Sequence, residues 1–121
     1  MTGILWIGLG GGIGAILRYG LSILPCVSSF PLLTLMTNVL GALLIGYVVG
    51  MGEIGAISGD GMKFLKTGLC GGFTTFSTFS LESYQMMMDG KQGEALLYAL
   101  LSVVLCLLGV FLGMNLARQM R

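Results

Sequence analysis

The 121-residue chain has the composition of a membrane protein. Hydrophobic residues make up 55% of it and charged residues only 9%, against roughly 25% charged residues in a typical soluble domain. Six Lys and Arg with five Asp and Glu cannot cover the surface of a soluble domain of this size. The net charge of +1 argues against nucleic-acid binding through a basic patch. The absence of histidine excludes catalytic triads and metal sites that depend on this residue.

The uncharged runs of the chain predict a single all-α domain, residues 1–121, with four membrane-spanning helices. The segment 25–31, which begins and ends with proline, separates the first two runs. Polar segments at 52–63 and 89–94 separate the others. The spacing leaves room for the ~20 residues that a helix needs to cross a bilayer. The expected spans are 3–23, 32–51, 65–87 and 95–117.

The positive charges favour one orientation only weakly. Four lie on the side of both termini, against Arg18 and Lys91 on the opposite side. The positive-inside rule then places both termini in the cytoplasm, although so small a bias also permits insertion in both orientations. We expect Arg18, near the end of its span, to extend its charge to the membrane surface. The four on the side of the termini are Lys63, Lys66, Arg118 and Arg121.

Glycine occurs 21 times, often at a spacing of four residues. Burial of apolar surface between helices gains little in a bilayer, so small residues at this spacing predict close packing of helix backbones. The segment 10–15 also fits the dinucleotide-binding pattern G-x-G-x-x-A. No strand precedes it, and we therefore reject that interpretation.

The third span is too polar and too rich in glycine for an ordinary lipid-facing helix. Paired Gly71-Gly72 beside the β-branched pair Thr74-Thr75 is unfavourable for an α-helix, so we expect this span to be broken at its centre. Broken backbone at membrane depth is tolerated where it is buried in protein or lines a cavity. The ends of half-helices then offer free N–H and C=O groups to ions. The alternative is a continuous packing helix whose hydroxyls bond back to their own backbone.

The same span interleaves aromatic rings with hydroxyl groups. Phe76 and Phe79 lie three residues apart on one helix face, with Ser77 and Thr78 between them. Hydroxyls can donate hydrogen bonds to an anion, and a phenyl ring presents a positive edge. Such groups can replace the water around a small anion such as fluoride, without a fixed charge that would hold it too tightly.

Two other spans place polar groups at membrane depth. Thr34 and Asn38 lie four residues apart on one face of the second span. An asparagine there is costly unless it is paired or functional, and both interhelical hydrogen bonding and a role in an ion pathway remain open. Tyr98, Ser102 and Cys106 recur every four residues along the fourth span and form one stripe.

Three motifs resemble those of the Fluc (CrcB) family of fluoride channels. They are GGFTTFSTFSLE at 71–82, GGIGAILRY at 11–19 and NVLG at 38–41. The first motif is highly specific, and the other two become specific when they occur in this order. Together with the chain length and the four-helix layout, they extend the resemblance over essentially the whole chain.

The resemblance implies a passive channel that exports F⁻ and lowers cytoplasmic fluoride, located in the cell inner (plasma) membrane. It implies an antiparallel dual-topology dimer with two pores, formed by two copies of this chain or with an oppositely oriented homologue. A structural Na⁺ at the dimer centre would be held by the backbone carbonyls of Gly71 and Thr74 from each subunit.

The resemblance also assigns roles to individual side chains. Phe76 and Phe79 match the pore-lining pair of rings, and Asn38 matches the pore asparagine. Arg18 and Glu82 match charged positions near the pore ends. Hydroxyl positions along or beside the pore are matched by Thr34, Ser77, Thr78, Tyr98 and Ser102.

A small multidrug-type proton-coupled transporter is the main alternative, since such proteins also have four helices. That activity needs a membrane-embedded carboxylate, yet the first span has none and Glu82 lies at the end of the third. A non-transporting assembly subunit would leave Asn38 and the aromatic and hydroxyl cluster without a purpose. We expect no enzyme, because the sequence offers no nucleophile–base pair.

Overall fold

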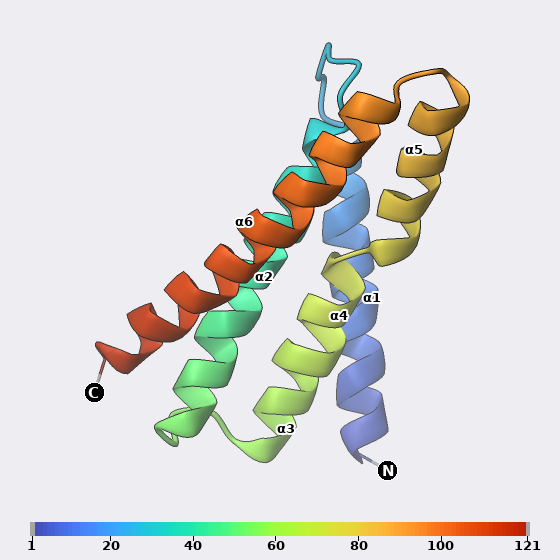
Figure 1. The fold of residues 1–121 in the computed structure, drawn as a ribbon. Helices are drawn as coiled ribbons and strands as arrows, with labels where there is room; N and C mark the ends of the chain where they lie inside the picture. The colour runs from blue at the N-terminus through green and yellow to red at the C-terminus, as the bar shows by residue number, and fades with distance from the viewer. Residues whose placement is uncertain (1, 121) are drawn as a thin grey trace.

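The computed structural model describes residues 2–120, in which the regular secondary structure is entirely helical, with no β-strand. The chain makes four passes that run alternately up and down (Figure 1). Three passes are single helices: α1 (Thr2–Ser22), α2 (Leu32–Glu53) and α6 (Gln92–Arg118). The third pass consists of α3 (Gly59–Met62), the π-helical segment η1 (Lys63–Cys70), α4 (Gly71–Phe73) and α5 (Phe76–Met88).

The helices α1, α2 and α6 are long and apolar enough to cross a membrane. They contain 21, 22 and 27 residues, against the ~20 that a bilayer requires. The third pass is divided, and α5 alone holds only 13 residues. The start of α1, the end of α6 and the connection from α2 to α3 lie at the same end of the bundle (Figure 1), as an even number of passes requires.

The third pass begins earlier than its composition suggests. The segment 52–63 has the polar composition of a loop, yet helix α3 begins within it at Gly59. The cause is a side-chain cap, because the Ser58 hydroxyl accepts a hydrogen bond from the backbone N–H of Gly61 at 3.0 Å. This bond satisfies one of the free N–H groups that every helix start exposes.

Glycine brings the helices together in two close pairs, α1 with η1 and α2 with α6. A Cβ atom at Gly10 or Gly14 of α1 would overlap a backbone carbonyl oxygen of η1. A Cβ atom at Gly46 of α2 or Gly113 of α6 would overlap a carbonyl oxygen of the partner helix. The close backbone packing that the glycine spacing predicts is therefore confirmed.

The buried core is small and lies where α2, α5 and α6 meet. Its main cluster is formed by Leu35, Met86, Ala95 and Tyr98. The other buried apolar residues in the described chain are Ala42, Val48, Cys70 and Ala117. Many large apolar side chains instead point outward, and Ile16, for example, is 71% exposed. An apolar exterior over a small interior suits a protein whose solvent is lipid.

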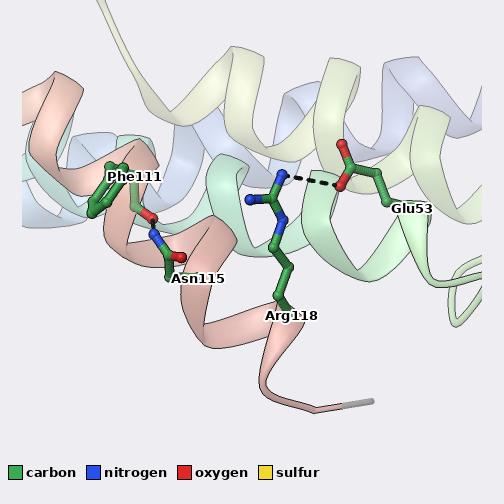
Figure 2. Close-up of polar contacts among 4 residues, drawn as sticks. All are labelled: Glu53, Phe111, Asn115 and Arg118. Carbon is green, nitrogen blue, oxygen red and sulfur yellow. Dashed lines mark hydrogen bonds and ion pairs between the residues drawn. The ribbon is translucent and has the colours of Figure 1, made fainter.

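Charged and amide groups gather at the C-terminal end of α6, as Figure 2 shows. The Arg118 guanidinium lies 3.6 Å from the Glu53 carboxylate at the end of α2, and both side chains are about half exposed. One turn earlier, the Asn115 side chain donates a hydrogen bond to the Phe111 carbonyl at 2.8 Å. An exposed ion pair of this kind contributes little to stability, and it marks the end of the apolar part of the bundle.

Candidate functional site

The third pass is broken at Thr74 and Thr75, as the sequence predicts. Helix α4 ends at Phe73, both threonines have extended backbone, and α5 begins at Phe76. Thr75 caps the new helix, because its hydroxyl accepts a hydrogen bond from the backbone N–H of Thr78 at 3.1 Å. The two half-helices thus expose an α4 carboxyl end and an α5 amino end at the same level of the bundle.

The side chain of Asn38, on α2, holds the extended backbone in place. Its Nδ2 donates to the Thr75 carbonyl at 3.0 Å, and its Oδ1 accepts from the Thr75 N–H at 2.8 Å. An amide has two N–H donors, and within residues 2–120 the second makes no hydrogen bond. Asn38 therefore forms the interhelical hydrogen bonds that were one of the two interpretations of its position, and its second side-chain N–H remains available as a donor.

Arg18 forms a hydrogen bond within the bundle that the sequence did not predict. Its Nε donates a hydrogen bond to the Gly72 carbonyl at 3.2 Å, and its side chain is half-buried. The carboxyl end of a helix carries partial negative charge and free carbonyl groups. The end of α4, beside the break, therefore stabilises the guanidinium.

Two carbonyl groups at the break are left free. In a continued α-helix the Thr75 N–H would bond to Gly71, but Asn38 has captured it. The Cys70 carbonyl is occupied by the backbone N–H and the hydroxyl of Thr74, at 3.0 and 2.9 Å. Within residues 2–120, the backbone hydrogen bonds of turns, loops and helix caps include none to the carbonyl oxygen of Gly71 or Thr74.

A groove of about 400 Å³ opens beside the break, between α2, the two halves of the third pass, and α6. Its wall includes the exposed ring of Phe76 and the buried hydroxyl of Ser102. The Ser102 hydroxyl has no hydrogen-bond partner within residues 2–120. The groove is lined by Asn38, Gly41, Ala42, Ile45, Cys70, Gly71, Thr74, Thr75, Phe76, Phe79, Ser102, Val103, Cys106 and Val110.

A second polar cluster surrounds the Glu82 carboxylate. Thr34 donates to its Oε2 at 3.1 Å, and the fully buried Tyr98 donates to its Oε1 at 3.0 Å. Phe79 connects this cluster to the groove, because its ring lines the groove and lies 4.9 Å from the Tyr98 ring, centre to centre. The Phe79 ring also lies 5.5 Å from the Phe76 ring, centre to centre.

The chain was compared with known families and curated proteins. The sequence model of the family described as "CrcB-like protein, Camphor Resistance (CrcB)" matches residues 5–114. This chain belongs to the CrcB family.

Several curated relatives carry the name "Fluoride-specific ion channel FluC". The relative from Shewanella frigidimarina is 45% identical over 119 residues, which cover 96% of each chain. That from Thermus thermophilus is 44% identical over 96% of this chain and 95% of its own. That from Pyrococcus furiosus is 44% identical over 92% of each. The name of these relatives and the apolar helices of this chain both indicate that this CrcB-family chain is a multi-pass membrane protein.

The structure divides the site residues that the CrcB resemblance suggested. The groove gathers Asn38, Gly71, Thr74, Phe76, Phe79 and Ser102. Thr34, Glu82 and Tyr98 form the adjoining cluster. Ser77 and Thr78 lie instead at the start of α5, with hydroxyls 3.4 and 3.1 Å from the Thr75 hydroxyl.

Thr75 is a site residue to which sequence reasoning gave no role of its own. It caps α5 and is the partner of Asn38. A threonine immediately before an apolar helical run is a recognised helix start, so this signal was present in the sequence. The pairing with Asn38 had no local signal, because the two residues are 37 apart in the chain.

Proposed function

We propose that this chain is a subunit of a fluoride-specific channel that lets F⁻ leave the cell passively. The groove beside the broken third pass carries this proposal, because it collects uncharged donors and aromatic rings at membrane depth. The name that the relatives carry identifies the ion. HF enters cells as a neutral acid and ionises in the cytoplasm, so a passive pathway for F⁻ is enough to remove it.

The groove offers fluoride replacements for its water of hydration. The free N–H of Asn38 and the unpartnered hydroxyl of Ser102 can both donate to an anion. The positive edges of the Phe76 and Phe79 rings add weaker attraction. The amino end of α5, with its partial positive charge, opens beside them. None of these groups carries a full charge, so the anion can leave again.

The Glu82 cluster extends the proposed pathway toward one end of the bundle. The hydroxyls of Thr34 and Tyr98 each donate to one oxygen of the Glu82 carboxylate. The Tyr98 ring contacts Phe79, which lines the groove, so this cluster adjoins the groove. Arg18, bound to the end of α4, places a positive charge near the break without entering the groove lining. We assign Glu82 to one end of the pore, and we propose that Arg18 acts on the pathway from beside the break.

The complete channel is proposed to be an antiparallel dimer in the cell inner membrane, with two pores. One subunit leaves the groove open on one side, where a second, oppositely oriented copy or homologue would close it. Such an arrangement brings together the free carbonyls of Gly71 and Thr74 from both subunits. Hard cations prefer oxygen ligands, and backbone carbonyls supply them. Side-chain ligands are not gathered for this purpose, since residues 2–120 contain no cluster of three or more His, Cys, Asp or Glu.

The Gly71 and Thr74 carbonyls fit a structural Na⁺, since neither accepts a hydrogen bond among the turn, loop and cap bonds of residues 2–120, and both residues line the groove. The ion would neutralise carbonyl dipoles that otherwise repel each other across the dimer centre. We therefore expect complete replacement of Na⁺ by N-methylglucamine to destabilise the dimer and reduce fluoride flux. The measurement is the melting temperature and subunit association in detergent across a Na⁺ series. Unchanged association and flux without Na⁺ would remove the cation from the proposal.

Replacing Phe76 by isoleucine should slow fluoride flux several-fold, because the ring edge in the groove is lost while the site stays apolar. Phe111→Ile is the matched control, since Phe111 is also exposed, at 64% against 78% for Phe76, but lies outside the groove. Both variants should remain dimeric. Equal flux in the two variants would exclude Phe76 from the pathway.

The function itself is tested with purified protein in liposomes loaded with potassium fluoride. A fluoride electrode should record rapid efflux once valinomycin balances the charge, and chloride-loaded liposomes should release little. Export of cationic drugs driven by an imposed pH gradient, without fluoride efflux, would instead establish the multidrug-type alternative. Absence of fluoride-selective efflux would refute the channel proposal.

A further inference from the structure

We propose that Gly41 is a positioning residue that sets the path of the broken backbone, and with it the proposed ion pathway. This inference rests on the fluoride-channel function proposed above. Asn38 and Gly41 lie three residues apart on one face of α2. Asn38 binds the backbone of Thr75, and Gly41 faces Thr74, the other residue of the break. Asn38 and Gly41 thus contact both extended residues of the break from one face of α2.

The space at Gly41 is filled by Thr74. Gly41 is buried, and a Cβ atom built on it would overlap the Cγ2 methyl of Thr74 and lie 3.2 Å from Cδ2 of Phe73. The missing side chain at position 41 is therefore what lets the break pack directly against α2. Gly41 differs in this respect from Gly46 on the same helix, where a Cβ atom would meet the backbone of Val110 on α6.

Thr74 cannot turn its methyl group away without a loss. Its hydroxyl donates to the Cys70 carbonyl at 2.9 Å, and a β-branched side chain moves its methyl and hydroxyl together when χ1 rotates. A methyl group at position 41 would therefore either break this bond or displace the Thr74 backbone. The displaced group would include the free Thr74 carbonyl, and the strain would reach Thr75 and its bonds to Asn38.

Gly41→Ala should reduce fluoride flux per folded dimer by about tenfold or more, as displacements near 1 Å can do at a positioned site. Thr74→Ser should reverse this loss in the double variant, because serine keeps the hydroxyl and the backbone carbonyl but lacks the overlapping methyl. The flux of Thr74→Ser alone is measured as the reference for the double variant. The melting temperature in detergent should fall in Gly41→Ala and recover in the double variant as well.

Two controls separate positioning from general damage. Gly46→Ala should lower the melting temperature through its clash with α6, and Thr74→Ser should not rescue it. Gly12→Ala should change neither quantity, since a Cβ atom there meets nothing within 4 Å. At an equal loss of melting temperature, Gly41→Ala should lose more flux than Gly46→Ala.

Each outcome of these measurements either supports or overturns the proposed role of Gly41. Rescue by Thr74→Ser supports the proposal, including the case in which Gly41→Ala alone fails to fold and the double variant folds. Normal flux in Gly41→Ala, a loss that Thr74→Ser leaves unchanged, or equal rescue of Gly46→Ala would overturn it. If the unmodified chain conducts no fluoride, the proposed function fails, and the melting-temperature rescue still decides whether Gly41 positions Thr74.

Discussion

Asn38→Asp is expected to reduce fluoride flux by about a hundredfold, the scale of effect seen when a single preorganised donor is lost from a polar site. Aspartate keeps an acceptor for the Thr75 N–H but places a carboxylate oxygen against the Thr75 carbonyl, where the amide donates now. It also removes the free N–H and adds negative charge to the wall of an anion pathway. Initial efflux rates from liposomes measure the effect.

Asn115→Asp is the matched control for this change. Asn115 lies at the end of α6, outside the groove, where it donates to the Phe111 carbonyl and Arg118 follows three residues later (Figure 2). A carboxylate there gains a nearby positive charge, so flux should stay near that of the unmodified chain. Full activity of Asn38→Asp, or an equal loss in Asn115→Asp, would contradict the role assigned to Asn38.

Gly14→Ala should cause a large loss of stability. Its Cβ atom would overlap the Leu69 carbonyl oxygen and lie 2.8 Å from the Phe73 backbone nitrogen. Backbone atoms cannot swing aside as a flexible side chain can, so α1 must separate from the third pass. We expect the free energy of unfolding to fall by about 1–3 kcal/mol, as overpacking does in well-packed interiors.

Gly12→Ala, two residues away on the same helix, provides the comparison. Its Cβ atom would meet nothing within 4 Å, and alanine is the better helix former, so stability should be unchanged or slightly higher. Unfolding in detergent, followed by circular dichroism, measures both variants. Equal stability of the two would mean that α1 and η1 do not pack as closely as described.

The break in the third pass could be predicted because its cause is local. Gly71-Gly72 and Thr74-Thr75 disfavour a helix wherever they occur, and the structure places the interruption at those threonines. The close helix pairs could be predicted for a similar reason, since small residues four apart form a stripe on any helix. Which helix each stripe would meet had no local signal, because the partners of Gly10 and Gly14 lie in η1.

The polar contacts could not be predicted, because their partners are distant in the chain. Thr34 and Asn38 share a helix face, yet one binds Glu82 and the other Thr75. Arg18 lies near a helix end, where a local rule favours the membrane surface. Its actual partner, the Gly72 carbonyl, is 54 residues away and exists only because α4 ends there.

The central claim is that fluoride itself crosses the membrane passively through this protein. Its most direct test is the reversal potential of the current through purified protein in a planar bilayer, with unequal fluoride and equal chloride on the two sides. The current should reverse at the equilibrium potential of fluoride and should not shift when chloride is varied. A reversal potential that follows chloride or the counter-cation, or the absence of any protein-dependent current, would contradict the account.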